Sequence, residues 1–175
     1  ELVYRYNDNS LFWGGNEYLF FENKDVRMAN LGVQYTDLQD LYHSYLYTDI
    51  DRSLRKYTYN PDINGGFKIT VLDRQDPSIE ADYTYVHFSL LTEEFLNQSV
   101  YVYGGFNNFS ISEDNKMTFN VDKGIYELSM LLKQGFYNYK YVVVDDDNTL
   151  FEGAVSGNFD ETENNHKVIV YYRDL

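Results

Sequence analysis

The chain has 175 residues, no cysteine and a formal net charge of −14 at pH 7. This negative charge repels the phosphates of nucleic acids and anionic membrane surfaces, and the lack of cysteine excludes disulfides, thiolate metal sites and cysteine nucleophiles. The 19 tyrosines and 12 phenylalanines, with only two prolines, favour strands over helices. We therefore expect an acidic, all-β protein that binds no nucleic acid.

Residues 1–78 form a β-rich N-terminal region in our interpretation. Residues 1–6 alternate as a strand, and further strands are expected near 17–22, 34–36, 42–47 and 67–72, with the strongest turn at 60–66. The sequence begins directly in strand-like residues, without the basic and then apolar start of a signal peptide. The region is either a second small sandwich, complete or incomplete, or an extension packed against the rest of the chain.

Trp13 is the only tryptophan and is followed by a Gly-Gly pair. Such a ring either anchors a core beside a glycine turn or is exposed for stacking and docking, because tryptophan is enriched in interface hot spots. No apolar run approaches the roughly 20 residues that span a bilayer, so the chain is not expected to cross a membrane.

Residues 73–78 are polar, contain a proline and show no periodicity, which favours a domain boundary. Residues 79–175 then form the second expected domain. Its seven expected strands are 82–91, 99–104, 116–121, 125–132, 136–145, 149–155 and 167–173. Seven short strands separated by turn signals are typical of an immunoglobulin-like β-sandwich.

The stretch from Tyr101 to Val144 has the strongest strand pattern in the chain. Tyr137, Tyr139 and Tyr141 share one strand face, and Tyr101 and Tyr103 share another. These rings either fill the core between the sheets or form a surface that binds a partner, and we expect at least part of the set to be an exposed platform.

No residue pattern predicts catalysis. The histidines His43, His87 and His166 stand outside any catalytic signature, and no nucleophile elbow, phosphate-binding glycine loop or zinc-protease helix motif is present. The acidic turns at 145–148 and 158–163 lack the spacing of a calcium loop. We expect no enzymatic activity, no cofactor and no metal site.

One resemblance covers about half of the chain. Gly104-Gly-Phe-Asn-Asn-Phe109, Gly124-Ile-Tyr-Glu127 and Gly135-Phe-Tyr-Asn-Tyr-Lys-Tyr141 resemble the early-set immunoglobulin-like modules of starch- and glycogen-active enzymes. This resemblance implies an α-glucan-binding module whose contacts would be Phe106, Asn107, Asn108 and Phe109. Phe109 stands where those modules typically carry tryptophan.

A second resemblance runs over nearly all of the chain. Phe12-Trp-Gly-Gly-Asn-Glu-Tyr, Asp62-Ile-Asn-Gly-Gly-Phe, Glu80-Ala-Asp-Tyr-Thr-Tyr-Val-His-Phe and Val170-Tyr-Tyr-Arg173 are similar to the C-terminal two thirds of a Bacteroidetes family. That family, formerly a domain of unknown function, is associated with the plug protein of the type IX secretion translocon.

The second resemblance implies a periplasmic protein, associated with the outer membrane, that docks on the β-barrel subunit of the translocon and closes its pore. It also implies a natural protein with a signal peptide and a further immunoglobulin-like domain before residue 1. The residues expected to contact a partner or ligand are Trp13, Tyr101, Tyr103, Phe106, Asn107, Asn108, Phe109, Tyr137 and Tyr139.

Overall fold

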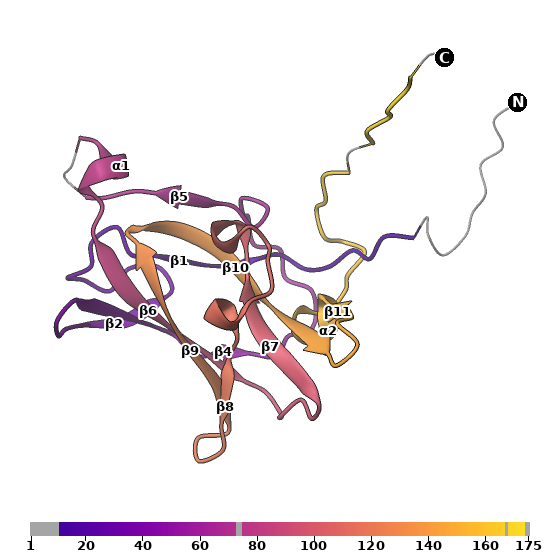
Figure 1. The fold of residues 1–175 in the computed structure, drawn as a ribbon, viewed down its shortest axis with the longest axis horizontal. Coiled ribbons are helices and arrows are strands. Elements are labelled where there is room, and N and C mark those ends of the chain that lie inside the picture. Colours follow the sequence, from indigo (N-terminus) through magenta and orange to yellow (C-terminus); the bar gives the residue numbers. More distant parts are fainter. Residues whose placement is uncertain (1–10, 73–74, 167, 174–175) are drawn as a thin grey trace, which may run out of the picture.

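The computed structural model describes residues 11–72, 75–166 and 168–173, which form two β-sheets packed face to face (Figure 1). The first sheet contains β1 (Leu19–Glu22), β5 (Phe67–Ile69), β7 (Gln98–Tyr103), β10 (Gly135–Asp145) and β11 (Leu150–Phe151). The second contains β2 (Val33–Leu38), β3 (Tyr42–Leu46), β4 (Asp49–Ile50), β6 (Tyr83–Leu91), β8 (Thr118–Asn120) and β9 (Ile125–Lys133). The expected all-β sandwich is confirmed.

Helical structure is limited to single turns in the described chain. These are α1 (Pro77–Glu80), α2 (Gly153–Ser156) and 3₁₀ turns at Gly105–Asn107 and Glu113–Asn115. No helix in the described ranges is long and apolar enough to cross a lipid bilayer.

Strand β10 organises the first sheet, and every one of its residues pairs with a neighbouring strand (Figure 1). Its first half lies between β1 and β5, and its second half lies between β7 and β11, all antiparallel. Pairing covers both edges of the strand, and residues 137–144 are all buried, so both of its faces are covered as well.

In the second sheet, β3 and β4 both run parallel to β6, but their registers differ by one residue. Tyr45 pairs with His87 and Asp49 pairs with Leu90, so four steps along one strand match three along the other. An extra residue of this kind reverses the alternation of side chains. Asp49 therefore faces inward beside the fully buried Leu90, although strict alternation from Tyr45 would have pointed it to solvent.

The core is rich in tyrosine, which corrects the expectation of an exposed platform on β10. Tyr137, Tyr139 and Tyr141 are 1–3% exposed and pack between the sheets with Phe21 and Phe88. The phenol groups can be buried because each hydroxyl donates a hydrogen bond. Alternation along β10 correctly grouped the three rings, but they face the other sheet.

The expected domain boundary at residue 78 is wrong. β1 and β5 flank β10, while β3 and β4 pair with β6, so strands from residues 1–78 belong to both sheets. Phe21, Val33 and Leu46 also share one buried cluster with Val86. The polar stretch before α1 is a connection within one sandwich.

Most of the later strands lie where the alternation predicted them, including 82–91, 99–104, 125–132 and 136–145. The expected strand 149–155 is shorter, because β11 ends at Phe151 and α2 follows. Residues 168–173 have no strand assignment, so the expected strand 167–173 is not formed over them, and the expected strand 1–6 lies outside the described residues.

Candidate functional site

The two terminal segments of the described chain lie side by side at one end of the sandwich (Figure 1). The Gly15 amide donates to Asn158 Oδ1 at 3.3 Å, the Phe159 amide donates to the Gly15 carbonyl at 2.9 Å, and Asn164 Nδ2 donates to the Gly14 carbonyl at 2.7 Å. A Cβ atom at Gly14 would lie 1.9 Å from the Phe159 carbonyl oxygen. Only glycine allows this close approach.

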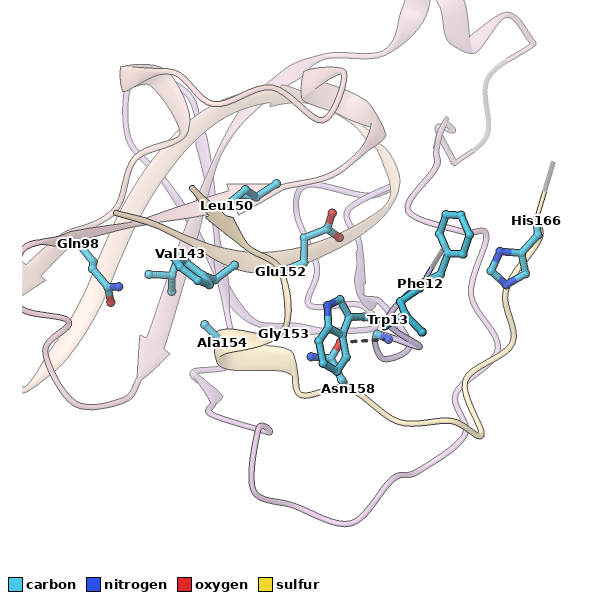
Figure 2. Close-up of a pocket in the computed structure, with 13 residues that line it drawn as sticks. Phe12, Trp13, Gln98, Val143, Leu150, Glu152, Gly153, Ala154, Asn158 and His166 are labelled. Carbon is cyan, nitrogen blue, oxygen red and sulfur yellow. Dashed lines mark hydrogen bonds between the residues drawn. The ribbon is translucent and has the colours of Figure 1, made fainter. Parts of the chain in front are cut away.

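A cleft of about 800 Å³ lies between these segments, β11 and α2. Trp13 and Asn158 both line the cleft, and Phe12 lies near His166 with 5.6 Å between the ring centroids (Figure 2). Phe12 and Trp13 are 77% and 84% exposed, so Trp13 is a surface ring and not a core anchor. Other cleft residues are Leu11, Gly15, Gln98, Val143, Leu150, Phe151, Glu152, Gly153 and Ala154.

The residues that line this cleft are of the types found in binding sites. Its walls are mainly apolar and aromatic, with a few polar side chains such as Gln98 and Asn158, which is the usual composition of a binding site. In the part of the chain that the structure describes, no group of three or more histidine or acidic side chains is placed to hold a metal ion.

Beside the cleft, the outer face of β10 carries one enclosed charge. Lys140 is buried, pairs with Glu152, and lies 5.0 Å from the Tyr18 ring centroid and 5.8 Å from that of Tyr103. Burial, followed by the nearby Glu152, raises the pKa of Tyr18 to about 12. Tyr103 is thereby partly covered, and its ring meets Phe109 edge-on at 5.4 Å.

The residues expected to bind glucan mainly build a turn. Phe106 packs edge-on against Tyr137, while Asn107 donates from Nδ2 to the Val102 carbonyl and accepts from the Gly104 amide. Asn108 closes the turn in the left-handed conformation at φ 55°. Of this group Phe109 is 41% exposed, and it does not line the cleft.

Three of the nine expected contact residues are almost fully buried. Tyr101, Tyr137 and Tyr139 are 7%, 2% and 3% exposed, because they lie on strands that are covered on both faces. The structure does not bring the remaining residues into one site. Trp13 lies in the cleft, whereas Tyr103, Phe106, Asn107, Asn108 and Phe109 lie at the end of β7 and in the turn after it.

Sequence reasoning missed a ladder of stacked rings on the outer face of the second sheet. Tyr35 stacks on Tyr45 at 4.3 Å, Tyr45 on His87 at 4.1 Å, His87 on His43 at 5.0 Å, and His43 on Tyr85 at 5.1 Å. Alternation placed Tyr85 and His87 on one face. The cross-strand register that adds the β2 and β3 rings was not visible in the sequence.

The ladder contains a hydrogen-bonded chain. His87 Nε2 lies 2.8 Å from His43 Nδ1, and His87 Nδ1 lies 2.6 Å from Ser129 Oγ. Burial, followed by the neighbouring His43, lowers the pKa of His87. The group that contacts His87 opposite Ser129 is the His43 imidazole, at the position where a serine-hydrolase triad has a carboxylate.

Comparison with known proteins places the fold and leaves the activity open. No family model and no curated protein matches the sequence. A crystal structure of a hypothetical protein from Parabacteroides merdae ATCC 43184 matches with a TM-score of 0.87 and 36% identity, over 91% of this chain and 41% of that chain. This chain thus spans about two fifths of the length of that protein.

Proposed function

We propose that the protein is a non-enzymatic interaction module that binds a protein partner through the terminal cleft. The observation that supports this most is that Phe12 and Trp13 are 77% and 84% exposed and both line the cleft. Exposing two large aromatic rings side by side costs solvation free energy, and rings in such positions commonly anchor interfaces.

The partner that we propose is the outer-membrane β-barrel subunit of a secretion translocon, with the protein acting as its periplasmic plug. Support comes from the sequence resemblance, which includes the Phe12-Trp-Gly-Gly motif of the cleft. A rigid two-sheet sandwich suits steric closure of a wide pore, because it presents a fixed surface and needs no bond chemistry. The related fold in a Bacteroidetes protein is compatible with this proposal.

The alternative is an α-glucan-binding module, and the structure gives it less support. Asn107 has its amide group engaged within the turn, and Phe106 packs against Tyr137. Stacking on sugar faces requires exposed flat rings, and of the two aromatic rings in this turn only that of Phe109 is exposed.

The test is an affinity purification of the tagged full-length protein from its native organism, followed by mass spectrometry of the outer-membrane fraction. We expect the barrel subunit to co-purify with the wild type, and Trp13→Ala to reduce its recovery at least tenfold. Leu54→Ala is the matched control, because Leu54 is 99% exposed and lies outside the cleft. Both variants should keep the melting temperature of the wild type.

Two results would overturn the proposal. One is the absence of the barrel subunit from the wild-type eluate, with retention of the protein on a glucan resin, which would favour the sugar-binding alternative. The other is equal recovery of the barrel with Trp13→Ala and the wild type, which would place the interface away from the cleft.

A further inference from the structure

A smaller pocket of about 280 Å³ opens where the edge strand β1 faces β3 and β4 of the other sheet. Its walls combine apolar and aromatic residues with one carboxylate, and they comprise Tyr18, Leu19, Phe20, Leu31, Gly32, Tyr47, Asp49, Asn60 and Tyr139. Asp49 lines this pocket because the register shift between β3 and β4 turns it inward. The volume is below that of drug-sized ligand sites and suits a single side chain.

Only one of the two oxygens of the Asp49 carboxylate accepts hydrogen bonds from the described part of the protein. Oδ2 accepts hydrogen bonds from the Tyr139 hydroxyl at 2.8 Å and from the Tyr141 hydroxyl at 2.7 Å. Within the described ranges, Oδ1 accepts no hydrogen bond, and no cation lies within 4 Å of the carboxylate. A partly buried carboxylate that lines a pocket and has no ion-pair partner is costly, so it points to a binding role.

The positive charge that acts on Asp49 belongs to Arg52, which makes its hydrogen bond to another residue. Arg52 acts on Asp49 electrostatically, but its Nη2 donates to the Glu17 carbonyl at 3.0 Å. The loss of solvation outweighs both Arg52 and the two phenols, so the pKa of Asp49 is raised above its ordinary value. A bound cation would reverse this effect.

We propose that this pocket binds a primary alkylammonium group, such as the end of a lysine side chain. The ammonium group would donate to Asp49 Oδ1, and the Tyr139 hydroxyl oxygen and the Asn60 amide oxygen are further acceptors among the lining residues. The alkyl stem would lie against the apolar wall that Leu19 and Leu31 form.

The carboxylate geometry selects ammonium over guanidinium. A guanidinium group binds most strongly when it donates to both oxygens of a carboxylate, and at Asp49 the two phenols already occupy Oδ2. An ammonium group is a point donor that needs one free oxygen. The net charge of −14 also raises the local concentration of cations around the protein.

This pocket lies apart from the terminal cleft, and the two share no lining residue. The proposal therefore does not depend on the secretion partner. Failure of one test leaves the other unaffected.

The test is an NMR titration of the protein with the N-acetyl methylamides of lysine, arginine and norleucine, and with n-butylammonium chloride. We expect saturable shifts at residues around the pocket, with lysine at least tenfold tighter than norleucine and severalfold tighter than arginine. Binding of n-butylammonium as well as the lysine compound would show that the site accepts a free alkylammonium ion. Binding of the lysine compound without binding of n-butylammonium would show that the peptide backbone contributes.

Two variants test the assignment. Asp49→Asn keeps the shape and removes the charge, and Tyr47→Leu alters a wall residue that is 58% exposed and therefore dispensable for folding. Both should weaken lysine binding at least fivefold, and Leu54→Ala should leave it unchanged. Lysine should also lower the pKa of Asp49 in a carboxyl carbon titration.

Overturning results are equally direct. No saturable shift of the wild type at 50 mM of the lysine compound would refute the site. Unchanged binding in both Asp49→Asn and Tyr47→Leu, or an Asp49 pKa that does not respond to the ligand, would do the same.

Discussion

Tyr139 and Tyr141 place their hydroxyls in the core, and both donate to one oxygen of Asp49. Strand β10 thus gains the contact area of two large rings, while a residue about 90 positions earlier in the chain satisfies their polar ends. Neither tyrosine would be suited to the core without this acceptor, because an unpaired buried hydroxyl costs free energy.

Replacing either tyrosine by phenylalanine tests this dependence. We expect Tyr139→Phe and Tyr141→Phe each to lower the free energy of unfolding by about 1.5–3 kcal/mol, since each removes a hydrogen bond to a charged group. The double variant should differ from the sum of the two by more than about 0.5 kcal/mol, because both donors share one oxygen. Urea unfolding at pH 7 measures all three.

Tyr171→Phe is the matched control, because Tyr171 is 91% exposed and should tolerate the loss of its hydroxyl within about 0.5 kcal/mol. Equal, small effects at all three single sites would show that Asp49 does not hold the core tyrosines.

At the scale of elements, two turn glycines share a left-handed backbone but differ in their surroundings. Gly32 has φ +77° and precedes β2, and a Cβ there would lie 2.6 Å from the Phe20 carbonyl oxygen and 2.9 Å from Phe21 Cβ. Gly124 has φ +66° in the turn before β9, with no atom within 4 Å of such a Cβ. The pair therefore separates backbone strain from steric conflict.

We expect Gly124→Ala to cost about 1–2 kcal/mol, the strain of a left-handed residue with a side chain. Gly32→Ala should cost about 1–3 kcal/mol more, because the β1 backbone must also move. Thermal and urea unfolding of both variants give the comparison. Equal losses would mean that the β1 contact yields without strain.

The ring ladder across β2, β3 and β6 makes the second sheet sensitive to acid. His87 is held neutral by burial and by the neighbouring His43, and its lowered pKa means that the unfolded chain binds a proton more readily than the folded one. The stability that His87 contributes is therefore present above the ordinary histidine pKa and is lost as the pH falls below that value.

NMR titration of the imidazole carbons should show His87 ionising below the ordinary histidine range. His43→Gln should raise the pKa of His87 by removing a neighbouring group that lowers it, but not to the ordinary value, because desolvation is the larger cause and remains in the variant. Ser129→Ala, which keeps the charges, is the control. An ordinary pKa for His87 in the wild type would contradict this account.

Alternation along single strands predicted most later elements, because strands such as 82–91 bury one face and expose the other. It predicted which side chains share a face, but not which face is the core, and so Tyr137 and Tyr139 were misjudged. That choice depends on the opposing sheet and on Asp49, which a one-residue register shift turns inward. The exposure of Trp13 was left open for the same reason.

At the scale of the whole molecule, the polar composition of residues 73–78 suggested a linker between two domains. Composition describes only the segment itself and does not show which sheets the neighbouring strands join. Sheet membership is not local, and β1 to β5 complete both sheets around strands that come later in the chain. The terminal cleft likewise joins residues about 140 positions apart, so no motif in the sequence could predict it.

The shared sheets predict one cooperative unfolding transition for the chain. A fragment of residues 79–175 should fail to fold, because it leaves the first half of β10 without neighbours and exposes one edge of β6. Circular dichroism and amide NMR spectra of the fragment and the full chain provide the test. Dispersed amide signals from the fragment would restore the boundary at residue 78.

The side-by-side terminal segments also determine how the molecule responds to mechanical load. Tension applied between residues 11 and 173 acts first on the short set of hydrogen bonds that joins Gly14 and Gly15 to Asn158, Phe159 and Asn164. These bonds open one after another, as in a zipper, and they do so before the strands of either sheet are sheared. The contact between the two terminal segments therefore opens at low force, and the two sheets keep their structure while the cleft opens.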